Sequence, residues 1–194
     1  MSIRVQTQSR VAAPVAGIGE EPHWWDKLRD GTHVLIRPIH GEDLDIERRF
    51  IESLSSQTRR LRFLGEIKTP SAALLDQLTH PDPTRDAAFV ALIADGAEKR
   101  EIGVARFSGR PDGLTCECAV VVSDEWQHQG LATILMRHLI EIARQRGIEC
   151  MYSVDSAGNQ GMHDLAAHLG FTRKADPDDA SQVLHVLDLK AATV

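Results

Sequence analysis

Residues 114–147 read LTCECAVVVSDEWQHQGLATILMRHLIEIARQRG and change character twice along their length. Residues 114–122 are mostly small or β-branched apolar residues, which favours a buried strand. From Leu131 onward the apolar residues recur at helical spacing, until Gly147 provides a C-terminal stop. The stretch therefore predicts a strand, a glycine turn and a long amphipathic helix.

The turn between these two elements has the features of an anion-binding site. Gly130 allows the backbone to approach a ligand closely, and the first turn of a helix leaves N–H groups without intrahelical partners. These groups and the positive end of the helix dipole favour a phosphate or pyrophosphate. A glycine here is equally compatible with a plain tight connection. The patterns G-x-x-x-x-G-K-[ST] and G-x-G-x-x-G are absent, so a nucleotide-binding fold is not indicated.

The same turn resembles the acyl-CoA loop of the GNAT superfamily of N-acetyltransferases. That loop has Gln or Arg, two residues, Gly, one residue, and then Gly or Ala, and this chain has Gln127, Gly130 and Ala132. The resemblance extends from Val34 to Phe171 and is closest to the bacterial protein-lysine acetyltransferase branch. The matching segments, in the family's order, are VLIRPIHGEDLD, LSSQTRRLRFLG, AAFVALIA, IGVARF, CECAVVVSDEWQHQGLAT and GNQGMHDLAAHLGF.

Pattern and resemblance together predict a mixed α/β domain with a mostly antiparallel sheet of six or seven strands flanked by helices. The strand, long helix and following strand form a crossover with locally parallel strands. In the resembling family the sheet is splayed at this place, where the central strand meets the one near Tyr152. Strands are predicted at residues 32–38, 87–94, 101–108, 114–122, 149–154, 171–173 and 183–189. Helices are predicted after Asp43 or Asp45, at 58–64 and 71–78, from 131 to the Gly147 stop, and at 159–169.

A chain of 194 residues suits a single domain, which we place at residues 31–190. Residues 1–30 show no sustained hydrophobic period and are expected to form an arm that is partly ordered at best. Residues 191–194 are expected to form a short tail. Two adjacent tryptophans, Trp24 and Trp25, stand out in the arm. They either cover the domain's own surface or anchor a contact between the subunits of a homodimer.

Composition argues against several classes of protein. The formal net charge of −6 is unfavourable for a nucleic-acid binder and suits a cationic substrate such as an amine. No apolar run approaches the roughly 20 residues that span a bilayer, so a membrane protein is not predicted. Three cysteines do not make a disulfide framework, which favours the reducing cytoplasm. Cys116 and Cys118 are expected to be small core residues rather than zinc ligands, and no metal is predicted.

The resemblance implies acetyl-CoA as the acyl donor. In the family its pantetheine arm pairs with the backbone of the central strand like an added strand, and N–H groups of the loop hold its pyrophosphate. The residues carried over to this chain for binding acetyl-CoA are Val120, Val121, Val122, Gln127, His128, Gln129, Gly130, Leu131, Ala132, Thr133, Asn159 and Met162.

Glu117 is the expected general base. A lysine ammonium, with a pKa of about 10.4, must lose a proton before its nitrogen attacks a thioester. Glu117 is a carboxylate in an otherwise apolar strand, where ionised side chains are rarely left unpaired. A structural pair with an arginine such as Arg106 across the sheet is the alternative. The resemblance favours the base, because lysine acetyltransferases of the family carry their catalytic Glu at this place, and the N–H of Val120 would polarise the thioester carbonyl.

The acid that protonates the departing thiolate is not identified by the sequence. Many members of the superfamily use a Tyr five residues before the Phe of a Gly-Phe pair, and this chain has Ala166 there. The lysine-acetylating branch resembles it in lacking that Tyr. Asn159 and His163 lie nearby in the sequence, and His163 is expected to be a solvated helix residue.

These features predict an acetyl-CoA-dependent N-acetyltransferase that transfers an acetyl group directly to a primary amine, with a protein lysine as the favoured acceptor. Two alternatives stay open: an acetyltransferase for a small amine, and a module that senses acyl-CoA without catalysis. A basic cluster of Arg59, Arg60 and Arg62 either meets anionic groups of a ligand or forms a solvated helix face.

Overall fold

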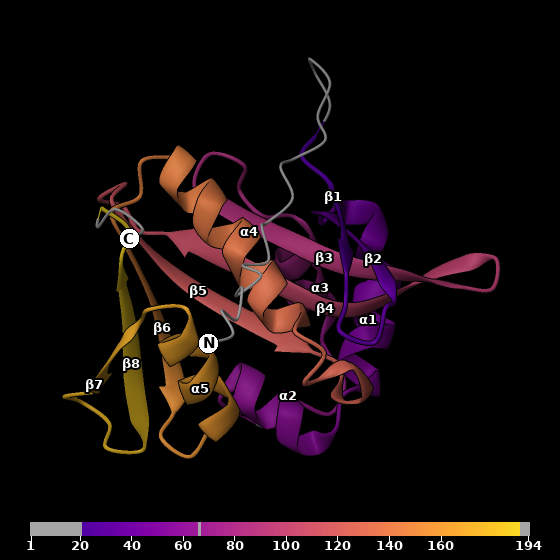
Figure 1. Cartoon of the computed structure of the whole chain (residues 1–194). Coiled ribbons are helices and arrows are strands. Elements are labelled where there is room, and N and C mark those ends of the chain that lie inside the picture. Colours follow the sequence, from indigo (N-terminus) through magenta and orange to yellow (C-terminus); the bar gives the residue numbers. More distant parts are fainter. Residues whose placement is uncertain (1–20, 66, 191–194) are drawn as a thin grey trace, which may run out of the picture.

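The sheet has eight strands in the order β1-β2-β3-β4-β5-β6-β8-β7, in a computed structural model that describes residues 21–65 and 67–190. Among the strands that the structure describes, only the β5–β6 pair is parallel (Figure 1). The strands are β1 (Trp24–Lys27), β2 (His33–Pro38), β3 (Asp86–Asp95), β4 (Glu98–Gly109), β5 (Thr115–Val122), β6 (Cys150–Ser156), β7 (Thr172–Ala175) and β8 (Gln182–Asp188). Residues 1–20 of the expected arm and the tail at 191–194 lie outside the described residues.

The predicted fold class is confirmed, with a mixed α/β arrangement and a largely antiparallel sheet. Each of the seven predicted strands is present, as are the predicted helices. The eighth strand, β1, lies in the segment assigned to the arm. It has four residues, too few to show an alternating pattern, and its identity as a strand depends on antiparallel pairing with β2.

Helices cover both faces of the sheet (Figure 1). On one face, α4 (Leu131–Gln145) crosses β3, β4 and β5, and its buried residues Leu135, Met136 and Leu139 belong to the larger core cluster. Phe50 of α1 and Leu75 of α3 belong to a second cluster on the opposite face. The remaining helical segments are η1 (Gly41–Asp43), α1 (Leu44–Ser53), α2 (Ser56–Phe63), α3 (Ala72–Thr79), η2 (Asp124–Trp126) and α5 (Gln160–His168).

Trp24 attaches β1 to this core. Its ring is 3% exposed, stacks on the imidazole of His138 with centroids 4.2 Å apart, and meets Phe89 edge-on at 5.2 Å. His138 Nε2 also lies 2.7 Å from the carboxylate of Asp26 on β1. Trp24 therefore covers the domain's own core, as one of the two interpretations predicted. Trp25 points the other way and is 60% exposed.

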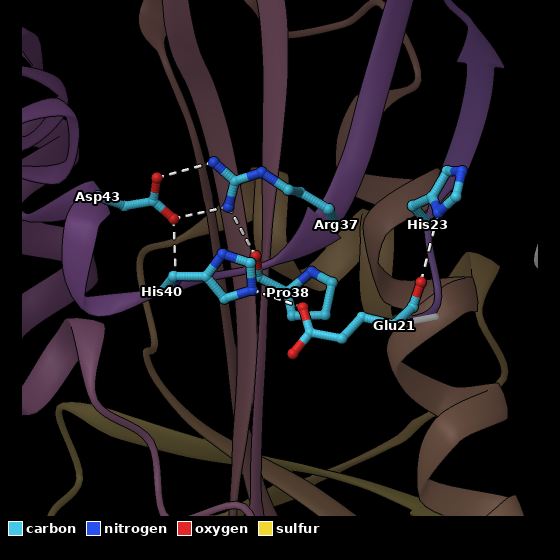
Figure 2. Close-up of polar contacts among 6 residues, drawn as sticks. All are labelled: Glu21, His23, Arg37, Pro38, His40 and Asp43. Atoms are coloured by element: carbon cyan, nitrogen blue, oxygen red, sulfur yellow. Dashed lines mark hydrogen bonds and ion pairs between the residues drawn. The ribbon is translucent and has the colours of Figure 1, made fainter. Parts of the chain in front are cut away.

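Figure 2 shows how the start of α1 is attached to β2. Arg37 donates to both carboxylate oxygens of Asp43, at 2.6 and 2.7 Å, and the backbone N–H of His40 donates to the same carboxylate at 2.8 Å. Burial opposes the ionised form, but these contacts outweigh it and lower the pKa of Asp43. Asp43, one of the two residues predicted to open this helix, is the N-cap of α1.

Candidate active site

The two central strands separate in the middle of the sheet. β5 pairs with β6 only from Thr115 to Glu117, opposite Cys150 to Tyr152, although β5 continues to Val122. On its other edge β5 stays paired with β4 along its whole length from Cys116. The backbone of residues 118–122 therefore has one edge without a neighbouring strand among the described residues. This is the predicted splay, and it offers hydrogen-bonding groups to an extended ligand.

Glu117 stands at the point where the strands separate. Neighbouring residues of a strand point to opposite faces, so Glu117 faces away from the core that contains Cys116 and Cys118. Its side chain is exposed, which differs from the buried position that the apolar strand suggested. The hydroxyl of Tyr152 on β6 donates to Glu117 Oε2 at 3.2 Å. Burial and the nearby charge of Glu117 raise the pKa of Tyr152, so its hydroxyl remains a donor.

Glu117 does not form the structural pair with Arg106 that was the alternative to a catalytic role. Arg106 on β4 pairs with the carboxylate of Glu47 on α1, at 3.2 Å, and donates to the carbonyl of Leu78 at 3.0 Å. In the β4–β5 register, Arg106 is opposite Ala119, whereas Glu117 is opposite Ser108. Arg106 is thus used to neutralise a buried acid under α1. Glu117 remains available to a ligand.

The glycine turn has the geometry of an anion site. Gly130 is the N-cap of α4 with φ +89°, a left-handed conformation that L-residues rarely adopt. It provides no side-chain cap, and helix geometry leaves the N–H groups of Leu131, Ala132 and Thr133 without intrahelical acceptors. A helix start of this kind favours a phosphate.

Gly103 brings α4 close to the sheet at this point. A Cβ atom at Gly103 would lie 3.2 Å from the Leu131 side chain and 3.2 Å from the carbonyl oxygen of Val121. The absence of a side chain on β4 thus lets the first residue of α4 pack directly on the sheet. Gly103 pairs with Val122, so this close packing places the start of α4 over the end of β5.

Arg29 contacts this loop from the segment after β1, and the sequence did not reveal it. It follows β1, and its backbone N–H donates to the carbonyl of Gln129 at 3.2 Å. Its guanidinium donates to the carbonyl of His128 at 3.2 Å and lies 3.6 Å from the position of a Cβ at Gly130. A positive charge beside the free N–H groups of α4 suits a pyrophosphate or phosphate.

Arg29→Ala is expected to weaken binding of acetyl-CoA by about 3- to 10-fold at low salt, because an exposed charge contributes modestly. The difference should shrink as salt screens the interaction. Isothermal titration at two ionic strengths measures it. Arg49→Ala, which removes an exposed arginine of α1, serves as the control. Equal affinities for Arg29→Ala and the wild type at low salt would exclude Arg29 from the binding site.

The other residues carried over for acetyl-CoA lie on β5, on the segment before α4 and at the start of α5. Val120 is partly buried on the open part of β5, while Val121 and Val122 are buried on opposite faces. The Asn159 side chain accepts from the N–H of Met162 and caps α5. Gln127 donates to the carbonyl of Val122 at 3.4 Å. None of these contacts tests their predicted roles, which stay predictions.

The start of α2 is fixed to the segment that leads into the loop. Asp124 of η2 accepts from the Ser55 N–H at 2.8 Å, from the Ser55 hydroxyl at 2.7 Å and from the Thr58 hydroxyl at 2.6 Å. Burial opposes ionisation, but these donors hold the pKa of Asp124 below its ordinary value. α2 also packs against β5. It thereby forms one wall beside Glu117.

The three arginines of the basic cluster on α2, Arg59, Arg60 and Arg62, have different surroundings. Arg59 donates to the carbonyl of Glu52 at 2.9 Å, and Arg60 is exposed. Arg62 is partly buried, and burial together with Arg106 lowers its pKa to about 10. Glu47 attracts Arg62 most strongly, followed by Glu117 and Asp155, and these carboxylates oppose that shift. The three arginines therefore do not form one continuous anion-binding face.

Two expectations about side chains in the core have different outcomes. Cys116 and Cys118 are buried free thiols, as predicted, and burial raises the pKa of Cys116 to about 12. The expectation that His163 is solvated is wrong, because it is 8% exposed. Its Nδ1 lies 3.0 Å from Nε2 of His185 on β8. A polar residue that faces a sheet instead of solvent cannot be recognised from a short helix pattern alone.

A hollow of about 480 Å³ lies at the β1–β2 end of the sheet, lined by Glu21, Pro22, His23, Trp25, Leu35, Arg37 and Pro38. Its charged groups are already engaged, since Arg37 is paired with Asp43 and Glu21 lies 2.6 Å from His40 (Figure 2). β2 is separated from β5 by β3 and β4. The hollow is therefore not part of the site around Glu117.

Within the described residues, no helix is both long and apolar enough to cross a bilayer.

The sequence is similar to those of known acetyltransferases. The Acetyltransferase (GNAT) family profile matches residues 53–171. An acetyltransferase of Pseudomonas aeruginosa is 51% identical over 185 residues, covering 95% of this chain and 98% of that protein. Acetyltransferase Pat of Mycolicibacterium smegmatis is 28% identical over 145 residues, covering 74% of this chain and 43% of that protein.

Structural similarity is also extensive. The crystal structure of the GNAT domain of S. lividans PAT superimposes with a TM-score of 0.78 at 25% identity, covering 86% of this chain and 96% of that domain. The matched family region includes the open strand β5, the glycine turn and the start of α4. The chain therefore belongs to the GNAT family of acetyltransferases.

Proposed function

We propose that this acetyltransferase moves the acetyl group of acetyl-CoA to lysine side chains of proteins by direct transfer, with Glu117 as the general base. The observation that carries the proposal is the exposed Glu117 carboxylate beside the open edge of β5, held by Tyr152. A protein lysine reaches a base at an open surface, whereas small molecules are usually bound in an enclosed pocket. Similarity to two Pat proteins supports the same choice.

In the proposed reaction, acetyl-CoA binds along β5 and the start of α4, and the acetyl group is transferred beside Glu117. The N–H groups at the start of α4 and the Arg29 guanidinium hold the pyrophosphate, and the open edge of residues 118–122 pairs with the pantetheine arm. The N–H of Val120 polarises the thioester carbonyl. Glu117 accepts a proton from the lysine nitrogen, directly or through a water molecule. The net charge of −6 favours the approach of a cationic acceptor.

Mass spectrometry of a proteome incubated with the protein and acetyl-CoA tests this function. We expect acetylation at a limited set of lysines, above the chemical background seen with heat-inactivated protein. Thiol release with a polyamine or amino acid, without protein acetylation, would instead identify a small-amine acetyltransferase. Tight binding of acetyl-CoA with no thiol release against any acceptor would identify a sensing module.

Two further expectations remain predictions. The buried thiols of Cys116 and Cys118 suit a reducing compartment such as the cytoplasm. A homodimer that uses the exposed Trp25 as an anchor is compatible with its position on the edge strand β1.

A further inference from the structure

Asp155 of β6, His185 of β8 and His163 of α5 form a hydrogen-bonded chain on the face of the sheet opposite Glu117. Asp155 Oδ2 lies 2.9 Å from His185 Nδ1, and His185 Nε2 lies 3.0 Å from His163 Nδ1. His163 Nε2 in turn lies 3.0 Å from the carbonyl oxygen of Ala157. The two imidazoles are 1% and 8% exposed, so water has little access to them.

The three contacts of this hydrogen-bonded chain determine how many protons its two imidazoles and its carboxyl group hold together. A carbonyl oxygen only accepts, so His163 carries a proton on Nε2. The contact between the two rings requires one proton, and the contact between His185 and Asp155 requires another. The three contacts together therefore need three protons. Two neutral imidazoles and a carboxylate supply only two, so a fully bonded chain carries one additional proton.

The additional proton makes the buried group electrically neutral. With Asp155 ionised, one imidazole is positively charged, and with the proton on Asp155, both rings are neutral. Either distribution has no net charge, which burial favours over an isolated carboxylate. The Ser153 hydroxyl also donates to Asp155 Oδ2, at 2.6 Å. The proton can thus move along the chain without creating a new buried charge.

Asp155, at one end of this hydrogen-bonded chain, borders the opening between β5 and β6. Asp155 lies three residues beyond Tyr152, where the pairing of the strands ends, and its side chain is 13% exposed. Its second oxygen, Oδ1, makes no hydrogen bond within the described residues. Burial is the main reason that the pKa of Cys118 on β5 is raised, and Asp155 and Glu117 add to it. Arg62 on α2 is attracted by Glu47 and, to a smaller extent, by Glu117 and Asp155.

We propose that Asp155 donates the proton that the departing CoA thiolate requires, with His185 and His163 as positioning residues that store it. This role rests on the proposed acetyl transfer and supplies an acid to a chain that has Ala166 where many superfamily members have a tyrosine. The proton arrives from solvent at a partly exposed carboxyl group and is retained by two buried rings.

The step balances in atoms and charge. When the tetrahedral intermediate collapses, the carbon–sulfur bond breaks and sulfur takes the electron pair. The carboxyl group of Asp155 takes the stored proton from His185 and gives a proton to sulfur, so an S–H bond forms. Asp155 is left as a carboxylate beside two neutral imidazoles. Glu117 holds the proton from the amine nitrogen and returns it to solvent, and solvent reprotonates the Asp155 chain.

Kinetics of Asp155→Asn and His163→Gln test the role, because both side chains keep a hydrogen-bonding shape but lose the transferable proton. We expect kcat to fall by about 10²-fold, with KM for acetyl-CoA within about twofold of the wild type. The wild-type rate should decline at alkaline pH as the chain loses its stored proton, and the variants should lack that decline. His168→Gln, an exposed histidine of the same helix, is the control and should behave as wild type.

A merely structural network would give a different result. Its variants would melt at a lower temperature and retain the wild-type pH profile, which would overturn the role of Asp155. An active wild type whose variants keep the alkaline decline overturns this role alone. A wild type that acetylates no amine removes the proposed function as well, so the two failures are distinguishable.

Nitrogen-15 NMR of the full chain with labelled histidine counts the protons without any assay of activity. We expect the His163 and His185 rings and the Asp155 carboxyl group to hold three protons in total at neutral pH. These are three ring protons beside an ionised Asp155, or two ring protons beside an Asp155 whose carbon-13 shift, read in a sample labelled at aspartate, is that of a carboxylic acid. Single His→Gln variants assign the ring signals. Two neutral rings with one proton each beside an ionised Asp155 would overturn the stored proton even if the variants prove too unstable for kinetics.

Discussion

Glu117→Gln is expected to lower kcat/KM for acetyl transfer to an amine by about 10²–10⁴, the usual contribution of a general base. Glutamine keeps the shape of the side chain and can still accept a hydrogen bond from Tyr152, but it cannot take a proton from an ammonium group. Affinity for acetyl-CoA should change little, because the expected contacts of that substrate lie on the β5 backbone and the α4 loop. A pH series of kcat/KM for both proteins on one amine is the measurement.

The shape of the pH profile separates a base from a structural carboxylate. If Glu117 is the base, the wild-type rate rises with pH through one ionisation. The variant should lose that rise and recover part of its rate at high pH, where free amine is plentiful. Glu141→Gln, on the exposed side of α4, removes the same charge and should leave the profile intact. An unchanged rise in Glu117→Gln would assign deprotonation to solvent or to another group.

Much of the fold was predictable because its decisive signals lie within one continuous stretch. The change from the strand at Val122 to the helix at Leu131 is a local change of period, and Gly130 lies in the predicted turn between them, at the N-cap of the helix. Glu117 was found for the same reason, since a single charge in an apolar strand is visible without tertiary information. Its exposure was not predicted, because it depends on where β6 leaves β5.

The residues that the sequence missed are brought together by contacts between distant segments. Arg29 meets Gln129 through the placement of β1 at the edge of the sheet, and these two residues lie 100 positions apart in the sequence. Tyr152 meets Glu117 only through the parallel β5–β6 register. No local pattern encodes such pairs. The same is true of Trp24, whose burial depends on the α4 surface that it covers.

The two residues proposed to transfer protons, Glu117 and Asp155, lie on opposite faces of the sheet beside the same opening. Glu117 faces the side covered by α1, α2 and α3, from which the proposed acceptor amine would approach. Asp155 faces the side of α5, where His163 and His185 exclude water. A base that takes protons from amines benefits from solvent contact, because it must release each proton. A donor benefits from burial, because its proton is retained until a thiolate forms.

Gly130→Val is expected to reduce acetyl-CoA affinity by more than about 100-fold while the domain stays folded. A β-branched residue at φ +89° is strained by about 1–3 kcal/mol, which the loop can relieve only by changing its backbone. The N–H groups of Leu131, Ala132 and Thr133 then lose their common direction toward a pyrophosphate. Calorimetric titration of the folded variant measures the affinity, and circular dichroism establishes the fold.

Gly147→Val is the matched control for this prediction. Gly147 lies at the other end of α4 with φ +76°, and nothing lies within 4 Å of a Cβ placed there. Its substitution introduces the same kind of strain into the same helix, so it should lower the melting temperature by a similar amount. Binding should survive, because the start of α4 is unchanged. Wild-type affinity in Gly130→Val would remove the loop from the binding site, and equal loss in both variants would assign the effect to helix stability instead of pyrophosphate contact.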